Sequence, residues 1–193
     1  MNFYSTFTKQ AELYKGKRLL LHSCCAPCSS AVLELLCPIF EVSVLYYNPN
    51  IFPEEEYLLR KNEQIRFLDE CCKSAGFIDC DSSPSDFYDA VKGYEHEKEG
   101  GSRCELCFGL RLLKTAETAV QKGFDIFGTT LTVSPHKNAE AVNAAGLAAQ
   151  EKTGAVFLVA DFKKKDGYKR SLELSRKFNL YRQNYCGCEF SKK

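Results

Sequence analysis

The stretch "LLLHSCCAPCSS", residues 19–30, joins an apolar run to the start of a helix and so indicates the fold class. The segment 18–23, "RLLLHS", reads as a buried strand, because it is short and rich in large apolar residues. Pro27 suits the first turn of the helix that follows, where a backbone N–H is not needed. A strand that leads directly into a helix is the basic unit of an alternating α/β chain.

Outward from this stretch, apolar runs and helical segments alternate along the chain. Four further runs predict strands, at 41–47, 77–80, 124–131 and 155–162. Helices are predicted at 53–76, 85–91, about 104–122, 138–154 and 167–178. Five apolar strands separated by helices predict a parallel sheet with helices on both faces.

The helix predicted at about 104–122 has an apolar stripe, which we expect to face the core. Its members are Leu106, Leu110, Leu113 and Val120. There is no internal repeat and no low-complexity linker, so we expect a single domain over residues 1–193, with a basic segment from about 163.

Composition fits one folded domain, since 45% of the 193 residues are hydrophobic and 26% are charged. The first residues lack the apolar stretch of a signal peptide, and Glu34 and Glu41 interrupt the longest apolar region. We therefore expect a cytoplasmic protein that contacts no membrane. In that reducing compartment, eleven cysteines indicate metal ligation or redox chemistry rather than structural disulfides.

The net charge of +1 hides an uneven distribution. The segment 163–193 holds ten basic residues against the three acids Asp166, Glu173 and Glu189. The basic residues are Lys163, Lys164, Lys165, Lys169, Arg170, Arg176, Lys177, Arg182, Lys192 and Lys193. Such a segment can contact the phosphates of a nucleic acid, and the alternative is a solvated basic tail.

Cys24 and Cys25 follow the first strand directly. Ligands of open parallel sheets bind beyond the carboxyl ends of the strands, and the dipole of the following helix favours thiolates there. Two extended neighbours point to opposite faces, so a shared site requires a tight turn between them. A tetrahedral sulfur site needs two more ligands from elsewhere in the chain.

The segment "RCELCFGLRL", residues 103–112, supplies a second pair. Cys104 and Cys107 are three residues apart at the start of a helix, and hence on one face. Adjacent cysteines such as Cys24 and Cys25 fit more easily at different corners of a cluster than on one zinc ion. The pattern favours a [4Fe-4S] cluster over zinc, and buried structural cysteines are a further alternative.

Further cysteines suggest additional chemistry near this centre. Cys28 is a fifth thiol, which indicates a second metal or a reactive thiol. Cys186 and Cys188 flank Gly187, whose backbone freedom suits a small-ring, redox-active disulfide. The alternatives for this last pair are ligation of the same metal or a reduced tail. Four other cysteines have no partner spacing and are expected in the core: Cys37, Cys71, Cys72 and Cys80.

Polar and aromatic residues after the second and fourth strands are candidate substrate contacts. The first group is Tyr46, Tyr47, Asn48 and Asn50, which could stack on a flipped base and read its edge. The alternative is a Tyr-rich strand end with an Asn-Pro turn. Ser134, His136 and Lys137 sit at the same edge, where His136 could donate a proton or cap a helix.

Three more residues complete the candidates. Tyr57 and Arg60 are one turn apart on the next predicted helix. Arg103 could pair with a phosphate, offset cluster charge, or form a surface salt bridge. His22 lies inside the first strand and is expected to be structural.

These motifs resemble those of the QueH-type epoxyqueuosine reductases over nearly the whole chain. The motifs are "LLLHSCCAPCSS", "YYNPNIFPEEEYLLR", "SRCELCFGLRL", "TTLTVSPHKN", "FKKKDGYKRS" and "LYRQNYCGC". The resemblance implies an enzyme that removes the epoxide oxygen from epoxyqueuosine in tRNA, and a fold related to the ATP-pyrophosphatase and nucleotide alpha-hydrolase (HUP) group. It also implies that Cys24, Cys25, Cys104 and Cys107 hold the cluster, that Cys186 and Cys188 form the redox-active disulfide, and that a second iron lies beside the cluster.

The chemistry of this reaction suggests roles for the sulfur sites. Converting an epoxide to an alkene needs two electrons, two protons and a Lewis acid for the departing oxygen. We expect the second iron, beside Cys28, to bind that oxygen and the cluster to supply electrons. We expect Cys186 with Cys188 to help recharge the cluster or shuttle electrons from an external donor. We expect no use of ATP, because "HSCCAPCSS" has no glycine with which to cradle a phosphate.

Two rival functions remain open at the level of sequence. One is a zinc-stabilised tRNA-binding module without catalysis. The other is a thiol-disulfide oxidoreductase that acts through Cys186 and Cys188. Metal content separates the three functions. The reductase predicts iron with sulfide, the tRNA-binding module predicts zinc alone, and the oxidoreductase predicts no metal.

Overall fold

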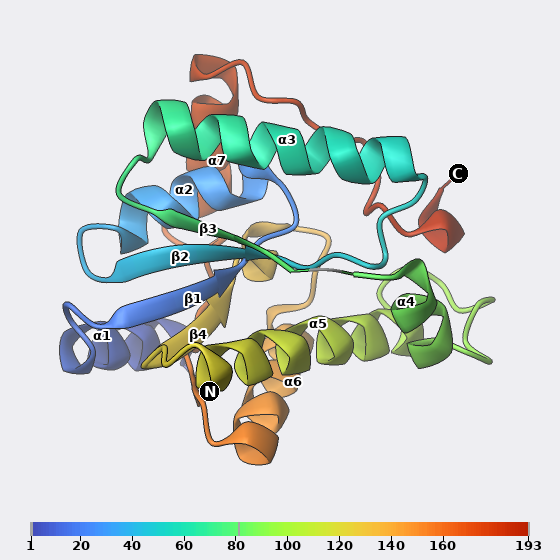
Figure 1. The fold of residues 1–193 in the computed structure, drawn as a ribbon, viewed down its shortest axis with the longest axis horizontal. Helices are drawn as coiled ribbons and strands as arrows, with labels where there is room; N and C mark the ends of the chain where they lie inside the picture. The colour runs from blue at the N-terminus through green and yellow to red at the C-terminus, as the bar shows by residue number, and fades with distance from the viewer. Residues whose placement is uncertain (1, 81, 193) are drawn as a thin grey trace.

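The computed structural model describes residues 2–80 and 82–192. Five parallel strands form one sheet in the order β3-β2-β1-β4-β5 (Figure 1). Their bounds are β1 Arg18–His22, β2 Glu41–Tyr46, β3 Gly76–Asp79, β4 Ile126–Thr129 and β5 Val156–Phe157. The predicted α/β class with a parallel sheet is therefore confirmed.

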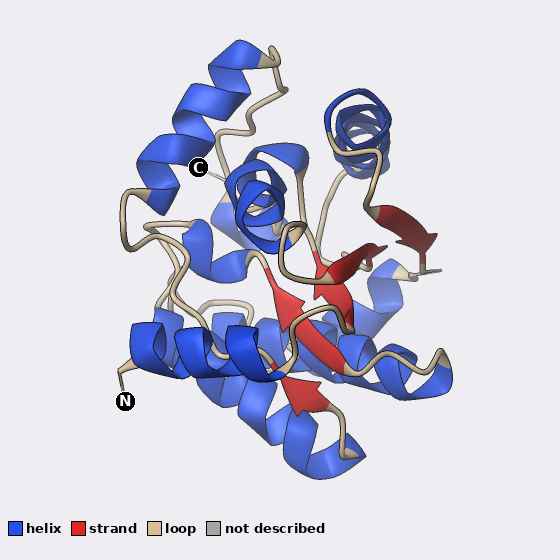
Figure 2. Cartoon of the chain, turned by 90° about the vertical axis from the view of Figure 1, so that its left-hand side faces the viewer, coloured by secondary structure: helices blue, strands red, loops and turns tan. Residues whose placement is uncertain are grey.

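Helices cover both faces of the sheet (Figures 1 and 2). The helices are α1 Phe3–Leu13, α2 Ala26–Leu36, α3 Glu54–Cys71, α4 Pro84–Ala90, α5 Ser102–Gln121, α6 Ala139–Thr153 and α7 Gly167–Lys177. Two short 3-10 helices follow β4 and close the described chain, at Leu131–Val133 and Glu189–Ser191. No helix in these two ranges has the length and apolarity needed to cross a bilayer.

Alternation along β1 builds two separate cores, because successive side chains point to opposite faces. Leu19 and Leu21 pack with residues of α2 and α3, and α7 packs on α2. Leu20 packs on the other face with Phe108 of α5 and Val142 of α6. All three leucines are fully buried, which explains why the run in β1 is continuous rather than alternating.

The strand order creates a switch point between β1 and β4. From β1 the chain moves outward through β2 and β3, then crosses back to place β4 on the other side of β1. His22 pairs with Thr129 in the register of these two strands, so their carboxyl ends are level. Ligands of doubly wound sheets bind at such a point. The segments that follow β1 and β4 therefore meet where a binding site is expected.

Some predicted boundaries were wrong. Helix α1 was not predicted, and it lies along the β5 edge, where Gln10 Nε2 donates to the carbonyl of Phe157 at 2.7 Å and Gln10 Oε1 accepts from Val159 N at 2.9 Å. The side-chain amide of Gln10 thus binds backbone groups at the sheet edge that a neighbouring strand would otherwise bind. Strand β5 itself is much shorter than the apolar run 155–162. Helix α3 ends at Cys71, and Gly76, predicted to close it, begins β3.

The predicted core stripe of α5 was also wrong in part. Leu106 and Val120 are exposed, at 38% and 54% of their surface. Leu110 and Leu113 are half-buried beside the alanines of α6. The buried face of α5 is offset by one residue and contains Cys107, Phe108, Arg111, Leu112, Thr115, Ala116 and Ala119. Because this face mixes polar and small residues with large apolar ones, the positions of the leucines alone predicted the wrong stripe.

Candidate metal centre

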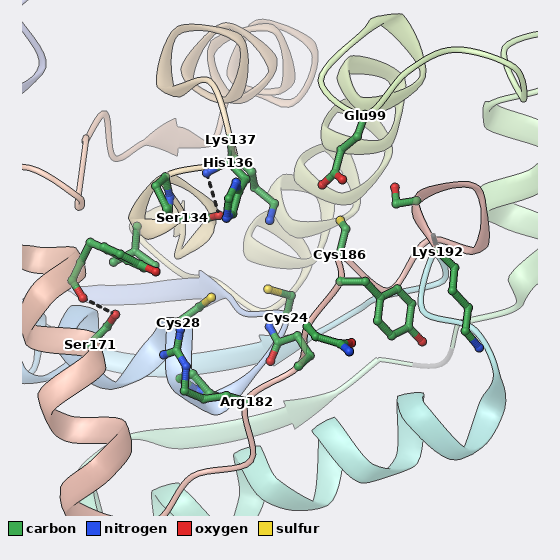
Figure 3. A pocket seen from close by; sticks show the side chains of 18 residues that line it. Cys24, Cys28, Glu99, Ser134, His136, Lys137, Ser171, Arg182, Cys186 and Lys192 are labelled. Carbon is green, nitrogen blue, oxygen red and sulfur yellow. Dashed lines mark hydrogen bonds between the residues drawn. The ribbon is translucent and has the colours of Figure 1, made fainter.

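A cavity of about 530 Å³ opens at the carboxyl edge of β1 and β4, where the switch point predicts a site. Its wall comes from the turn after β1, the segment after β4 and the C-terminal segment 182–192 (Figure 3). Cys24, Cys28 and Cys186 all present sulfur atoms to this space. Lys137 points its amine toward them from the opposite wall. The cavity thus combines thiols with a cation.

The turn between β1 and α2 gathers three sulfurs. Cys25 is the N-cap of α2 and is extended, with φ of −174°, while Pro27 occupies the first turn. The Sγ atoms of Cys24 and Cys25 are 3.8 Å apart, and with Cys28 all three lie within 4.8 Å of one another. Sulfurs bound to one tetrahedral zinc at about 2.3 Å stand about 3.8 Å apart, so this spacing suits a metal. The turn required for a shared site is present.

Hydrogen bonds from neighbouring thiols, and then positive charge, favour the thiolate form of Cys24. Hydrogen bonds from Cys25 and Cys28 lower the pKa of Cys24 well below its usual value, against the opposing effect of burial, and Lys137 and Arg111 add to the shift. Burial opposes the charge of Lys137, yet its electrostatic interactions with Cys186, Cys24 and Cys28 raise its pKa overall. The contacts with Cys24 raise the pKa of Cys25 to about 12 and the pKa of Cys28 above its usual value, so Cys24 is the thiolate of the group, and the thiolate is the form of cysteine that binds metals.

Polar side chains hold this turn in place. Gln64 Oε1 accepts hydrogen bonds from the hydroxyls of Ser23 and Ser29, each at 2.9 Å. Gln183 Nε2 donates to the sulfur of Cys25 at 3.0 Å. These contacts tie α3 and the C-terminal segment to the sulfur group. Outer partners of this kind orient metal ligands and tune them.

Cys104 and Cys107 lie in the first two turns of α5. Cys104 packs against the apolar cluster that contains Cys24 and Cys25, and its sulfur accepts from Gly100 N at 3.2 Å. Cys107 is buried, which raises its pKa to about 12. Among residues 2–80 and 82–192, three cysteine sulfurs lie within 4.8 Å of one another only in the turn after β1. Cys104 and Cys107 are not members of that group. Each cysteine of a [4Fe-4S] cluster binds a different iron, so its ligands need not approach as closely.

Arg111 interacts with both cysteine pairs, and it was not among the site residues predicted from the sequence. Its side chain is 1% exposed, Nε donates to the carbonyl of Cys107 at 3.2 Å, and Nη2 has no partner among the described residues. Burial opposes its charge, but Cys107, Cys186, Cys24 and then Cys104 raise its pKa overall. A buried cation with an unused N–H requires a nearby anion. An arginine one turn after Cys107, on the same helix face as Cys104 and Cys107, is the sequence signal for it.

Cys186 and Cys188 occupy different environments. All eleven cysteines are free thiols in this structure. Cys186 faces the cavity, whereas Cys188 is buried with Phe87, Val91 and Cys107, and burial raises its pKa. A disulfide between Cys186 and Cys188 therefore stays a prediction.

Arg60 and Gly187 fix the loop that carries Cys186. The guanidinium of Arg60 donates to the carbonyls of Cys186 at 3.0 Å and Tyr185 at 3.3 Å, and it pairs with Glu56 at 2.7 Å. Gly187 has φ of +106°, and a Cβ there would lie 3.1 Å from Arg60 Nη1. Only glycine fits this backbone without strain. Arg60 is not among the described residues that line the cavity. It acts on the site by holding the loop that carries Cys186.

The residues predicted to stack on the substrate are buried. Tyr46 donates its hydroxyl to the carbonyl of Tyr57 at 3.3 Å and packs edge-on against that ring. Tyr47 donates to Asp86 at 3.0 Å, and Asn48 donates to the carbonyl of Ser23 at 2.9 Å. Tyr46, Tyr47, Asn48 and Asn50 are 0–3% exposed and are not part of the cavity wall. The segment after β2 therefore supports the sulfur turn, through the hydrogen bond of Asn48 to Ser23.

Arg103 is buried rather than part of a surface salt bridge. Its Nη1 donates to the carbonyls of Glu95 at 2.7 Å and Glu97 at 2.5 Å, and its guanidinium stacks on Phe190. Nε and Nη2 have no partner among the described residues. It anchors the polar loop before α5. By contrast, Ser134, His136 and Lys137 line the cavity as the topology predicts.

His22 is confirmed as a structural residue in its contacts. It is fully buried, its Nε2 lies 3.2 Å from the carbonyl of Tyr47, and its Nδ1 lies 3.0 Å from the hydroxyl of Thr129. A carbonyl can only accept, so Nε2 carries the proton and Nδ1 accepts from Thr129. Burial lowers the pKa of His22 to about 3.

This low pKa predicts an acid-sensitive fold. The unfolded chain protonates His22 near its ordinary pKa of about 6.5, whereas the folded protein does so only near pH 3. Stability from this residue is therefore complete above about pH 6.5 and falls as pH drops, by up to about 1.4 kcal/mol per pH unit. Urea unfolding between pH 7 and pH 5 should show a steeper loss for the wild type than for His22→Gln. An equal loss of stability in the two proteins would show that the pKa of His22 is not lowered in the folded protein.

Comparison with known proteins supports one family. A sequence model described as "Epoxyqueuosine reductase QueH" matches residues 19–193. A protein of that name from Streptococcus pyogenes serotype M1 is 42% identical over 179 residues, which cover 91% of this chain and 70% of that protein. The relative of the same name from Haemophilus influenzae is 42% identical over 188 residues, 95% of this chain and 75% of its own. The one from Thermotoga maritima is 36% identical over 177 residues, 90% of this chain and 89% of its own.

Proposed function

The chain belongs to the epoxyqueuosine reductase QueH family, and from this premise we propose that it catalyses the two-electron reductive deoxygenation of epoxyqueuosine in tRNA to queuosine, in the cytoplasm. One observation supports this most strongly: Cys24, Cys25 and Cys28 gather their sulfurs within 4.8 Å of one another, and two of them, Cys24 and Cys28, face a cavity that Lys137 also lines. Reduction of an epoxide needs an electron source and an acid for the oxygen, and this arrangement offers places for both.

The donor set fits a resident metal group. We assign Cys24, Cys25, Cys104 and Cys107 as ligands of a [4Fe-4S] cluster and place a second iron beside Cys28. When bound, these metals would supply electrons and a Lewis acid for the departing oxygen. The support is the donor chemistry: thiols stand at two helix N-termini, and cysteines of both pairs raise the pKa of the buried Arg111, whose Nη2 has no partner among the described residues.

The cavity wall supplies the protein's own part in the reaction. Lys137 faces the sulfurs from the segment after β4, and His136 lies beside it. We assign these two as the donors that hold the epoxide oxygen and deliver a proton to it. Tyr46, Tyr47, Asn48 and Asn50 support the turn in this proposal, and Tyr57 with Arg60 and Arg103 supports the loops around it.

Basic residues of the C-terminal segment are suited to the tRNA backbone. Arg182 and Lys192 stand on the cavity wall, where phosphates of an inserted nucleotide would pass. Arg170 and Lys163 are occupied in ion pairs with Glu34 and Asp161, while Lys193 lies outside the described residues. Binding to phosphates should weaken as salt rises, because each neutralised phosphate releases counterions.

The Cys186 and Cys188 pair is assigned the role of recharging the centre. Cys186 stands at the cavity while Cys188 lies behind it, so a dithiol-to-disulfide step would carry two electrons toward the metals. The double variant Cys186→Ser, Cys188→Ser should bind metal and complete a single turnover but fail to sustain further turnovers. The measurement is queuosine formed per enzyme with a chemical reductant in excess. Sustained multiple turnover by the double variant would remove this role.

The reaction itself is tested by nucleoside mass spectrometry. Protein purified anaerobically and iron-replete is incubated with a reductant and tRNA that carries epoxyqueuosine, and the digested nucleosides are then measured. We expect epoxyqueuosine to be replaced by a species lighter by one oxygen atom. Unchanged epoxyqueuosine under these conditions would contradict the proposal. Heat-denatured protein in the same mixture is the control for reduction without the enzyme.

A further inference from the structure

Two cysteines far from the cavity lie side by side, although nothing in their spacing along the chain pairs them. Cys37 caps the carboxyl end of α2 and Cys72 caps that of α3. Their sulfur atoms are 3.5 Å apart, which is hydrogen-bonding distance for two thiols. Helix α2 carries Cys28 in its first turn, nine residues before Cys37, so about 14 Å of helix separates this pair from the sulfurs of the cavity.

We propose that Cys37 and Cys72 are a modification site: a hydroperoxide oxidises them to an intramolecular disulfide that links α2 to α3. This inference is independent of the proposed function, since it rests on contacts at the opposite end of both helices. It replaces the expectation that these two cysteines serve only as core residues. Both side chains are half-buried and not fully enclosed, so a molecule as small as hydrogen peroxide reaches them.

The surroundings assign a different part to each sulfur. The hydrogen bond from Cys72 lowers the pKa of Cys37 to about 7, against the opposing effect of partial burial, and Ser74 adds a second hydrogen bond. The same contact raises the pKa of Cys72. Cys37 is therefore the more acidic of the two thiols and the one that attacks first. Cys72 is the resolving partner.

The chemistry balances with peroxide as the sole oxidant. The Cys37 thiolate attacks one peroxide oxygen, the O–O bond breaks, and the departing hydroxide takes a proton to become water. This leaves a sulfenic acid on Cys37. The sulfur of Cys72 then attacks that of Cys37, the S–O bond breaks, and a second water leaves. In total two thiols lose two electrons and two protons, and one hydrogen peroxide becomes two waters.

Formation of the bond would act on the elements that hold the metal centre. Helix α2 carries Cys28 and Ser29, while α3 carries Arg60 and Gln64, which bind the Cys186 loop and the sulfur turn. A link between the far ends of these two helices would restrain both. Oxidation at the carboxyl ends of α2 and α3 therefore has a structural route to the metal centre.

Peptide mapping tests the proposal. The metal-loaded protein is exposed to a few equivalents of hydrogen peroxide, free thiols are blocked with an alkylating agent, and the chain is digested without reductant. Cleavage after Glu, Lys and Arg isolates Cys37 in "LLCPIFE", residues 35–41, and Cys72 in "CCK", residues 71–73. We expect these two peptides to be joined, with the link lost on treatment with dithiothreitol.

Matched variants decide which sulfurs are joined. Cys71 is the neighbour of Cys72, so Cys71→Ser should keep the link and Cys72→Ser should lose it. The proposal would be overturned by alkylated Cys37 and Cys72 after peroxide treatment, by a link from Cys37 to Cys71, or by Cys37 oxidised to a sulfinic acid in the wild type. These readouts do not depend on activity, so they stand whether or not the reductase reaction is observed.

Discussion

Replacing Cys24 by serine is expected to abolish both metal binding and reductase activity. Cys24 sits at the centre of the sulfur group: it lies 3.8 Å from the sulfur of Cys25, and its pKa is lowered by hydrogen bonds from Cys25 and Cys28. Loss of an outer partner of a metal ligand typically costs 10–100-fold, so loss of the ligand itself should cost more than about 100-fold. Iron content and queuosine formation should fall together.

Cys71→Ser is the matched control for this variant. Cys71 ends α3, away from the cavity, and is not part of its wall. Its replacement should leave iron content and activity unchanged within error. A Cys24→Ser protein that folds normally and retains its full iron would show that the metal is held elsewhere.

Replacing Arg111 by methionine is expected to destabilise the protein and to shift the reduction potential of the proposed metal centre. The guanidinium is 1% exposed, and four cysteines around it raise its pKa against the effect of burial. Removing one partner of a buried charge pair costs about 3–5 kcal/mol, because the remaining charge is left without compensation. Urea unfolding should show a loss of this size, and Arg111→Lys should recover part of it.

The reduction potential separates an electrostatic role of Arg111 from a packing role. Reduction adds a negative charge to the centre, and a cation nearby favours that charge. The Arg111→Met protein should therefore have a more negative potential in a redox titration, while Arg111→Lys stays near the wild type. Arg170→Met, which breaks an exposed pair with Glu34, is the control and should alter neither property. An unchanged potential in Arg111→Met would limit Arg111 to packing.

The fold could be predicted from the sequence because its signals are local. The run in β1 and the start of α2 at Pro27 define a strand-helix unit without reference to the rest of the chain. Helix α1 and the shortness of β5 could not be predicted in this way. Their structure depends on Gln10 binding the backbone of residues 157 and 159, which are about 150 positions away.

The candidate site was predictable only in part for the same reason. Helix starts place Cys24, Cys25, Cys104 and Cys107 at the ligand edge of the sheet, and this follows from topology. Whether a tyrosine at that edge faces the cavity or the core depends on packing, and Tyr46 and Tyr47 are buried. Nor does spacing reveal the contact between Cys37 and Cys72, because it is made by two helices whose relative placement the sequence does not specify.

Iron and acid-labile sulfide analysis of protein purified without oxygen tests whether the chain holds an iron-sulfur centre. In our proposal, sulfurs from the turn after β1 and from the start of α5 hold one such centre close to Arg111. We expect four or more irons per chain, with sulfide to match, and the loss of both in the Cys24→Ser and Cys107→Ser proteins. Zinc without iron would instead support a tRNA-binding module, and protein free of metal would support a thiol-disulfide oxidoreductase. Either result would contradict the account.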